Sequence, residues 1–371
     1  MIYADNAATT KLCVEAYDSM KPYLHDQYGN ASQPYSFSRP AKEALRSARE
    51  TIAACIGATP DEIYFTSGGT ESDNWVIKSS LFMPTKRDEV ITSQIEHHAI
   101  LNSCRTIREL GIKVRYLPVD NSGTVCPVSL ENAISEHTGL VSIMFANNEI
   151  GTIEPIKKLA KVAHANGLVF HTDAVQAVGH IPIDVHALGV DLLSSSAHKF
   201  NGPKGIGFLY IKNGVNIHSY ADGGSQEQKH RAGTENIASI VGMSSALKLN
   251  TQRMFEEEKK LRTLENILIR SLHESGLDFI RNGSENHLPG HVSLSFREAD
   301  GEMLLHRLDL MGICISTGSA CDSVNTQVSH VIKAVKVPDE YAEGTIRITF
   351  GADNTESDAV EIANAIKKVL L

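Results

Sequence analysis

The 371-residue chain has no long apolar run, and it begins without the features of a secretory leader. No stretch reaches the roughly 18 consecutive apolar residues that a membrane-spanning helix needs. Met1–Leu12 contains no basic segment followed by an apolar one, so we expect no secretory signal. These absences predict a cytoplasmic protein with no membrane partner.

Cysteine is also scarce, and the spacing of the six cysteines argues against two common kinds of site. None of them forms a C-x-x-C pair, so we predict neither a zinc ribbon nor a thioredoxin-type redox site, and no metal site. Without a secretory signal we also expect no disulfide framework. For most of them the simplest interpretation is a small buried apolar residue. They are Cys13, Cys55, Cys104, Cys126, Cys314 and Cys321.

Positive charge is in deficit, with 35 Lys and Arg against 44 Asp and Glu and a net charge of -9. An acidic chain repels a phosphate backbone, so we expect no direct binding of nucleic acid. The content of 42% hydrophobic and 21% charged residues is typical of a globular enzyme.

Short β-branched runs alternate with helical stretches through the first two thirds of the chain. This alternation predicts an α/β fold with a mostly parallel, seven-stranded sheet covered on both faces, whose ligands bind at the carboxyl ends of the strands. The predicted strands are Ile63–Thr66, Val90–Thr92, Val114–Leu117, Val141–Ala146, Val169–Asp173, Leu192–Ser195 and Gly207–Ile211. The helical segments between them include Ala41–Ile56, Thr70–Ser80, His98–Leu110 and Ile156–Asn166.

The chain is too long for one ordinary core, and its pattern changes near residue 250. Apolar residues from Phe255 to Leu272 recur at helical spacing, which predicts an amphipathic helix connecting two domains. We place a large domain at 15–255 and a smaller α+β domain at 1–14 and 256–371. The elements expected in the small domain are strands at His291–Phe296, Cys314–Ser316 and Thr345–Phe350, and a closing helix from Glu356.

The run Thr66–Glu71, with sequence TSGGTE, follows a predicted strand and opens a helix. Its two glycines let the backbone approach an anion, and a helix start offers free N–H groups and the positive end of the helix dipole. The run therefore suits a phosphate group. Taken alone, it is equally compatible with a simple helix cap and a tight turn.

Two charged residues stand at the ends of predicted strands. Asp173 ends an apolar run, where a carboxylate can hold a cationic ring nitrogen or simply cap a turn. Lys199 directly follows a buried strand, and a desolvated lysine is the kind that forms Schiff bases, although it can also extend to solvent. Pyridoxal phosphate (PLP) needs a phosphate cup, a carboxylate for its ring nitrogen and a lysine for its aldehyde, and the chain offers all three.

Longer motifs resemble those of the cysteine desulfurases, which belong to the class V branch of the fold-type I aminotransferases. The resemblance covers essentially the whole chain and implies a PLP-dependent fold-type I enzyme. It is carried by Ala4–Thr10, Thr66–Ser72, Glu96–Ala99, Asn147–Gly151, His171–Gln176, Ser196–Lys199, Arg231–Asn236 and Ser316–Cys321.

The resemblance implies a role for each residue of the cofactor site. Lys199 is expected to bind PLP covalently, Asp173 to pair with the ring nitrogen, and His97 to stack on the ring and take part in proton transfer. Asn148 and Gln176 are expected near the ring's phenolic oxygen. Gly69, Thr70, Ser196 and His198 are expected to hold the phosphate, together with Thr234 from the neighbouring subunit of a homodimer.

The resemblance also implies the reaction. Asn30 and Arg347 match the family's grip on the substrate carboxylate. Cys321, on a small and flexible loop at about 317–330, matches the nucleophile that takes sulfur from L-cysteine as a persulfide and leaves alanine. The spacing from Cys321 to Ser329 resembles the long-loop branch, which includes the nitrogenase-type and housekeeping iron–sulfur enzymes.

The resemblance implies a sulfur-acceptor protein, either an iron–sulfur scaffold or a thiolation enzyme. Two alternatives stay open from the sequence: a selenocysteine lyase or another class V PLP enzyme, and a non-catalytic protein that kept the fold. The chain departs from the family at Gln228 and Lys229, where an arginine and a glycine are common, and at Ala352 and Asp353.

Overall fold

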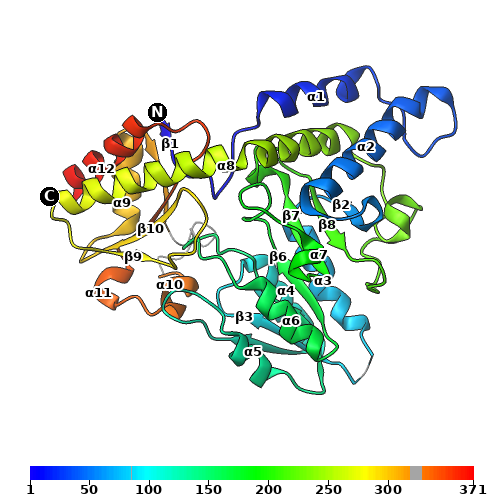
Figure 1. Cartoon of the computed structure of the whole chain (residues 1–371), viewed down its shortest axis with the longest axis horizontal. Helices are drawn as coiled ribbons and strands as arrows, with labels where there is room; N and C mark the ends of the chain where they lie inside the picture. Colours follow the sequence, from blue (N-terminus) through cyan, green and yellow to red (C-terminus); the bar gives the residue numbers. More distant parts are fainter. Residues whose placement is uncertain (85, 318–327) are drawn as a thin grey trace.

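A computed structural model describes residues 1–84, 86–317 and 328–371, and a seven-stranded sheet forms its centre (Figure 1). The strand order is β2-β8-β7-β6-β5-β3-β4. Only β8 runs antiparallel to its neighbours, so the predicted mostly parallel α/β sheet is confirmed. The strands are β2 (Ile63–Thr66), β3 (Glu89–Ser93), β4 (Lys113–Leu117), β5 (Thr138–Ser142), β6 (Val169–Asp173), β7 (Leu192–Ser196) and β8 (Gly207–Ile211).

One predicted strand is displaced. The apolar run Val141–Ala146 suggested a strand at those residues, but β5 ends at Ser142. The chain beyond it still lies along β6, because the amides of Ile143 and Phe145 donate to the carbonyls of His171 and Asp173. The apolar residues after Ser142 therefore continue the line of β5 alongside β6, as far as the carboxyl end of β6.

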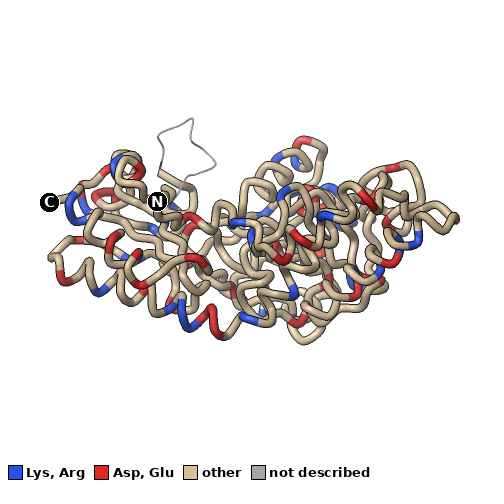
Figure 2. The backbone as a smooth tube through the Cα atoms, turned by 90° about the horizontal axis from the view of Figure 1, so that it is seen from above, with Lys and Arg blue, Asp and Glu red and all other residues tan. Residues whose placement is uncertain are grey.

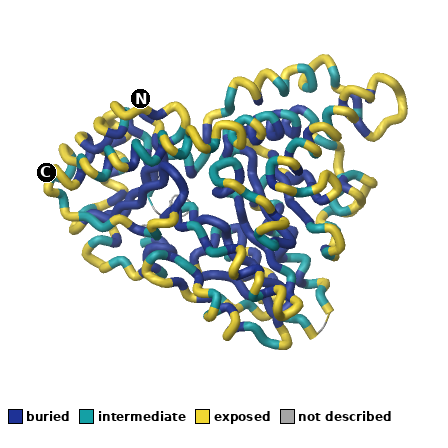
Figure 3. Tube along the Cα trace, viewed as in Figure 1, coloured by how far each residue is buried: buried dark blue, intermediate teal, exposed yellow. Residues whose placement is uncertain are grey.

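Helices cover both faces of this sheet, and alternating strand residues supply the two cores. In β2, Ile63 and Phe65 join one buried cluster while Tyr64 joins the other, as the two-residue period of a strand requires. Figure 3 shows the strands as the most continuously buried part of the molecule. The first cluster includes residues of α2 (Arg39–Ile56), α5 (Pro127–Ala133) and α6 (Ile156–Ala165), and the second includes residues of α3 (Gly69–Ser79) and α4 (His98–Glu109).

The long helix α8 (Ile237–Glu274) leads from this body to a second one (Figure 1). There a four-stranded antiparallel sheet has the order β12-β13-β10-β9, and β1 pairs with β11 in parallel. Its strands are β1 (Ile2–Tyr3), β9 (Phe279–Asn282), β10 (His291–Phe296), β11 (Ile313–Cys314), β12 (Ser316–Thr317) and β13 (Thr345–Thr349). The helices that supply its core are α9 (Gly301–Leu310) and α12 (Glu356–Leu370), whereas buried residues of α10 (His330–Ala334) and α11 (Asp339–Ala342) join the first cluster of the large body.

A separate apolar core supports the second body. It combines Ile2 and Ala4 with residues from Leu261 onward, so the two ends of the chain share one cluster. The proposed boundary at residue 255 falls inside α8, which continues through it without a break. The division into 15–255 against 1–14 and 256–371 remains a prediction.

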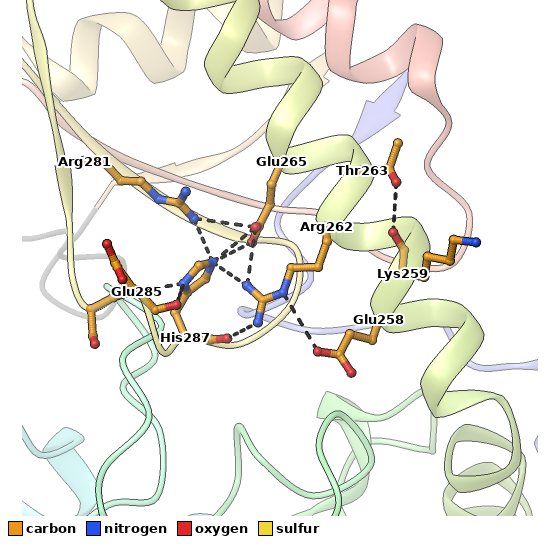
Figure 4. Close-up of polar contacts among 9 residues, drawn as sticks. Glu258, Lys259, Arg262, Thr263, Glu265, Arg281, Glu285 and His287 are labelled. Atoms are coloured by element: carbon orange, nitrogen blue, oxygen red, sulfur yellow. Dashed lines mark hydrogen bonds and ion pairs between the residues drawn. The ribbon is translucent and has the colours of Figure 1, made fainter.

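A buried carboxylate joins α8 to the segment after β9 (Figure 4). Glu265 lies within 3.0 Å of the His287 ring and within 3.6 Å of Arg262 and Arg281. The segment that contains His287 also contacts the chain between β5 and α6 of the large body, since the Ile153 N–H donates to the Asn286 carbonyl at 3.0 Å. We call Glu265, His287, Arg262 and Arg281 the junction cluster.

Charges of both signs are interspersed along the described chain (Figure 2). Among residues 1–84, 86–317 and 328–371, no helix combines the length and apolar character needed to cross a bilayer.

Candidate active site

A cavity of about 360 Å³ opens at the carboxyl ends of β6 and β7. It lies where ligands of parallel α/β sheets bind. All of the predicted cofactor-binding residues except Thr234 line it: Gly69, Thr70, His97, Asn148, Asp173, Gln176, Ser196, His198 and Lys199. The fold thus brings together residues that are up to 130 positions apart in the sequence, as from Gly69 to Lys199.

Asp173 and Lys199 supply the opposite charges of the cavity. Asp173 ends β6, and its carboxylate accepts the Val175 N–H at 2.9 Å. Burial raises the pKa of Asp173 to about 6, against the opposing effects of that N–H and of Lys199. Lys199 follows β7 in a single 3-10 turn, and its Nζ donates to the carbonyls of Ala7 at 2.5 Å and Ala8 at 2.9 Å.

Two histidines of the cavity are neutral at neutral pH. His97 is the N-cap of α4 and accepts the Ala99 N–H at 3.1 Å. Burial, and then the nearby charge of Lys199, lower the pKa of His97 to about 4. The same two causes, in the same order, lower the pKa of His198 to about 4. A neutral imidazole can stack on an aromatic ring and accept or donate a proton.

The anion-binding end of the cavity is built on the start of α3. Gly68 has φ 146°, and a Cβ on Gly69 would lie 2.4 Å from the Val175 side chain, so the turn requires glycine at both positions. The helix start directs backbone N–H groups and its positive dipole end into the cavity. Ser196 and His198 from the end of β7 add polar side chains.

These donors fit PLP. The cavity combines a helix N-terminus for a phosphate, a buried carboxylate for a ring nitrogen and a lysine amine for an aldehyde. The strand β2, which leads into the phosphate end, and β7, which leads to Lys199, are the two neighbours of β8 and run in the same direction.

The N-terminal segment closes the cavity, which no single residue pattern indicated. The Ala7 carbonyl accepts from both Lys199 and Gln176, the latter at 3.0 Å. The Thr9 hydroxyl lies 3.2 Å from the His198 ring. The family motif Ala4–Thr10 thus contributes backbone carbonyls as well as the side chains of Asp5 and Thr9.

Arg347 lies in the cavity as the resemblance implied. It comes from β13, is 3% exposed, and bonds to the Asp5 carboxylate at 2.7 Å and the Asn148 carbonyl at 2.8 Å. Its Nε is buried and has no hydrogen-bond partner among the described residues. An unsatisfied guanidinium N–H in a cavity suits a substrate carboxylate.

Two of the predicted site residues that the structure describes lie elsewhere. Asn30 does not line the cavity, and its side-chain oxygen accepts the Ser32 N–H at 2.9 Å. Thr234 is exposed and outside the cavity lining. Cys321 lies outside the described residues.

The structure also adds residues that the sequence interpretation missed. Asp73, His98, Glu149 and His330 line the cavity. Asp73 had a usable signal, because it lies four residues after Gly69 on the same helix and therefore on the same face. Glu149 and His330 reach the cavity only through tertiary packing of distant segments.

The family model for "Aminotransferase class-V" matches residues 2–362. Curated relatives match over the full chain. The "Cysteine desulfurase IscS" of Dictyoglomus turgidum is 48% identical over 371 residues, covering 100% of this chain and 94% of the relative. The protein of the same name from Methanosarcina thermophila is 45% identical, covering 100% of this chain and 92% of the relative.

Solved structures are similar over the same extent. A "NifS-like protein" superposes with a TM-score of 0.94 at 36% identity, covering 100% of this chain and 99% of that chain. A structure described as "SspA in complex with cysteine" gives a TM-score of 0.85 at 34% identity, covering 94% of this chain and 99% of that chain.

Proposed function

The chain belongs to the class-V aminotransferase family, and on that premise we propose that it is a PLP-dependent cysteine desulfurase. It takes sulfur from L-cysteine, releases L-alanine, and carries the sulfur as a persulfide on Cys321. The observation that carries the proposal is one cavity holding the start of α3, Asp173 and Lys199 together. The full-length relatives named cysteine desulfurase support it.

The residues that line the cavity indicate how it would hold the cofactor. Gly69, Thr70, Ser196 and His198 would hold the phosphate, and Asp173 would pair with the ring nitrogen. Gln176 and Asn148 would lie near the phenolic oxygen. When bound, PLP supplies an electron sink for the α-carbon of an amino acid.

Lys199 moves the proton of the substrate α-carbon. The carbonyls of Ala7 and Ala8 hold its Nζ at the mouth of the cavity, which fixes the position from which it acts. Neutral His97 also lines the cavity, where it would contact the bound cofactor and could exchange protons without adding charge. Arg347 binds the substrate carboxylate through the N–H for which the described residues offer no partner. Because this guanidinium is already fixed by Asp5, binding costs little side-chain entropy.

Cys321 performs the sulfur transfer. Its thiolate attacks the substrate sulfur, because the thiolate and not the thiol is the nucleophile. A sulfur–sulfur bond forms as the carbon–sulfur bond breaks. The electron pair stays with the β-carbon, which takes a proton and becomes the methyl group of alanine.

We infer a homodimer in which each subunit completes the partner's site. Thr234 is exposed and away from its own subunit's cavity, so a role at a phosphate requires a second copy. Large apolar side chains are exposed on α1 (Val14–His25) and on the segment after it, which indicates a covered face. They are Tyr17, Leu24, Tyr28, Tyr35 and Phe37.

The sulfur acceptor follows from the chemistry of a persulfide. A persulfide passes its outer sulfur to another protein thiol, so we propose a cytoplasmic iron–sulfur scaffold or thiolation enzyme as partner. The name IscS that the relatives carry supports this class of partner.

The test is persulfide labelling of the purified holoenzyme after mixing with L-cysteine, with alanine measured in parallel. The wild type should form one labelled cysteine per active site and release alanine. Cys321→Ser should keep its cofactor colour and lose both signals, because a serine hydroxyl is not appreciably ionised near neutral pH. Cys126→Ser is the matched control, since Cys126 is exposed and absent from the cavity lining.

The loss in the Cys321→Ser variant should appear in kcat and not in KM, because the thiolate acts at the transition state. Alanine release at the wild-type rate from this variant would contradict the proposal. A lyase that needs no protein persulfide would then account for the activity.

A further inference from the structure

A second aspartate lies in the cavity beside Asp173. Asp73 is on α3, one turn beyond Gly69, and it is 1% exposed. Side-chain atoms of Asp73, His97 and Asp173 all lie within 4.8 Å of one another. Oδ1 of Asp73 is buried and has no hydrogen-bond partner among the described residues. The chemistry set out above uses Asp173 and leaves Asp73 without a role.

The surroundings of Asp73 offer it little compensation for a negative charge. The His171 ring lies beside it, with Nε2 3.8 Å from Oδ1. His171 is fully buried between the hydroxyls of Ser142 at 2.8 Å and Ser194 at 3.0 Å. Burial lowers the pKa of His171 to about 3, so the ring is neutral and supplies no positive charge. Glu96, also fully buried, adds a further carboxyl nearby.

Two desolvated carboxyl groups this close cannot both be ionised without a large cost. Of the two, Asp173 is the more easily ionised, because its carboxylate accepts the Val175 N–H and lies near Lys199. Burial, and then the charge of Asp173, raise the pKa of Asp73 well above its usual range, while the Ser194 hydroxyl opposes this. A cationic ring nitrogen next to Asp173 would favour the same distribution.

We propose that Asp73 is a positioning residue: a neutral carboxylic acid that directs its proton at Asp173, holds that carboxylate in place for the cofactor's ring nitrogen, and keeps the site at one negative charge. The inference rests on the proposed function, since that function gives Asp173 its task. Donation of that proton to Asp173 gives a partner to the Asp73 carboxyl group, whose Oδ1 otherwise has none among the described residues.

Two properties of Asp73, its hydrogen-bond donor and its charge, can be tested separately by substitution. Asp73→Asn keeps a donor of the same size and can never ionise. Asp73→Leu fills a similar volume and has no donor. If Asp73 is neutral and donates, the asparagine variant matches the wild type and the leucine variant does not.

The experiment titrates each apoprotein with PLP across a range of pH and follows the dissociation constant. As the pH falls, Asp173 becomes protonated and binding weakens, so the acid limb of the profile reports the pKa of Asp173. Removing a donor from Asp173 raises that pKa, and the limb moves to higher pH. A purely structural role of Asp73 would weaken binding at every pH without moving the limb.

We expect Asp73→Asn to bind PLP within about threefold of the wild type with the same acid limb. Asp73→Leu should bind about tenfold or more weakly, as for a lost hydrogen bond to a charged group, with the limb at higher pH. An asparagine variant whose limb moves to lower pH would overturn the proposal, because that shift is the mark of removing a neighbouring negative charge. A leucine variant identical to the wild type would also overturn it.

Infrared spectroscopy of the apoprotein keeps the proposal testable if Asp73→Leu does not fold. The wild type should show the carbonyl stretch of a buried protonated carboxyl group near neutral pH, and Asp73→Asn should lack that contribution. An unchanged band would contradict the assignment. Asp173→Asn separates this outcome from the proposed function: if that variant binds PLP as well as the wild type, the proposed cofactor site is wrong.

Discussion

Lys229 has a backbone conformation that favours glycine. Its φ is 70°, and the two residues before it, Glu227 and Gln228, also have positive φ values of 43° and 55°. Buried Glu227 holds this segment through Arg49, at 2.7 and 2.9 Å, and through the Phe65 N–H at 3.0 Å. The departure from the family pattern at residue 229 therefore places a side chain where the fold requires a left-handed residue.

Lys229→Gly should stabilise the protein, by about 0.5–1 kcal/mol, because the relief of backbone strain exceeds the entropy that glycine adds to the unfolded chain. Lys229 is exposed, so no packing is lost. Denaturant unfolding of the apoprotein measures the change. Lys229→Ala is the control, since alanine keeps the Cβ and should gain nothing. A glycine variant less stable than the alanine variant would contradict this account.

Single residues differed in how far the sequence could predict them. Asp173 and Lys199 were predictable because strand-end charges are rare unless they are paired or used. Glu149 was missed, since a carboxylate inside a loop gives no sign of its burial. Asp73 was also missed, although its spacing of four residues from Gly69 on one helix places both on the same face. The backbone carbonyls of Ala7 and Ala8 could not be found by any search for reactive side chains, although they hold Lys199.

At the scale of elements, α8 is longer than its sequence pattern indicated. The amphipathic pattern that was visible begins near Phe255, whereas the helix begins at Ile237. Its first half packs on several sides and so lacks the polar face that reveals a helix in a sequence. Gly242 lies there, and a Cβ on it would meet the Met20 side chain of α1 at 2.6 Å. The close crossing of two helices, invisible in the sequence, explains the glycine.

The junction cluster should contribute more to stability than a surface ion pair on the same helix. Glu265→Gln removes a carboxylate whose side chain is 3% exposed, and it leaves Arg262, Arg281 and His287 without the negative charge that they share. We expect a loss of about 2 kcal/mol in the free energy of unfolding. Chemical denaturation measures it, with Glu258→Gln as the matched control.

Glu258 lies 4.0 Å from Arg262, with a side chain that is 42% exposed, so its replacement should cost less than about 0.5 kcal/mol. Equal losses of unfolding free energy in the two variants would show that burial of Glu265 in the junction cluster adds nothing to stability. Figure 4 shows both glutamates on α8 with Arg262 between them.

At the scale of the whole molecule, the exposed apolar face on α1 and the segment after it predicts a dimer. Replacing Leu24 and Phe37 together by glutamate should yield monomers, because two charges would be buried without partners. The monomers should bind PLP at least about tenfold more weakly, since each site loses the partner's Thr234. Analytical ultracentrifugation and PLP titration measure the two effects.

Leu310→Glu is the control for adding charge at an exposed leucine, since this residue of α9 is 88% exposed and belongs to the second body. It should remain dimeric. A wild-type protein that is fully active as a monomer at assay concentration would contradict the prediction.

The order and type of most large-domain elements could be predicted from alternation, because the strands other than β4 are largely buried and helices follow several of them closely. The second body was harder to predict. The strand expected at Cys314–Ser316 is in fact β11 and β12, which join different sheets. Such an exchange depends on where the distant N-terminus lies, and local sequence carries no information about that.

The bond between Asp5 and Arg347 joins residues 342 positions apart. The N-terminal segment that follows Asp5, with the carbonyls of Ala7 and Ala8, closes the cavity. On the ribosome, the first residues emerge early but have no place to dock until β11 and β13 have been made. Their docking sites are therefore among the last parts of the protein to be synthesised. The large sheet can form during translation, yet the pocket reaches its final shape only when the chain is nearly complete, so cofactor capture is expected to mark the end of biogenesis.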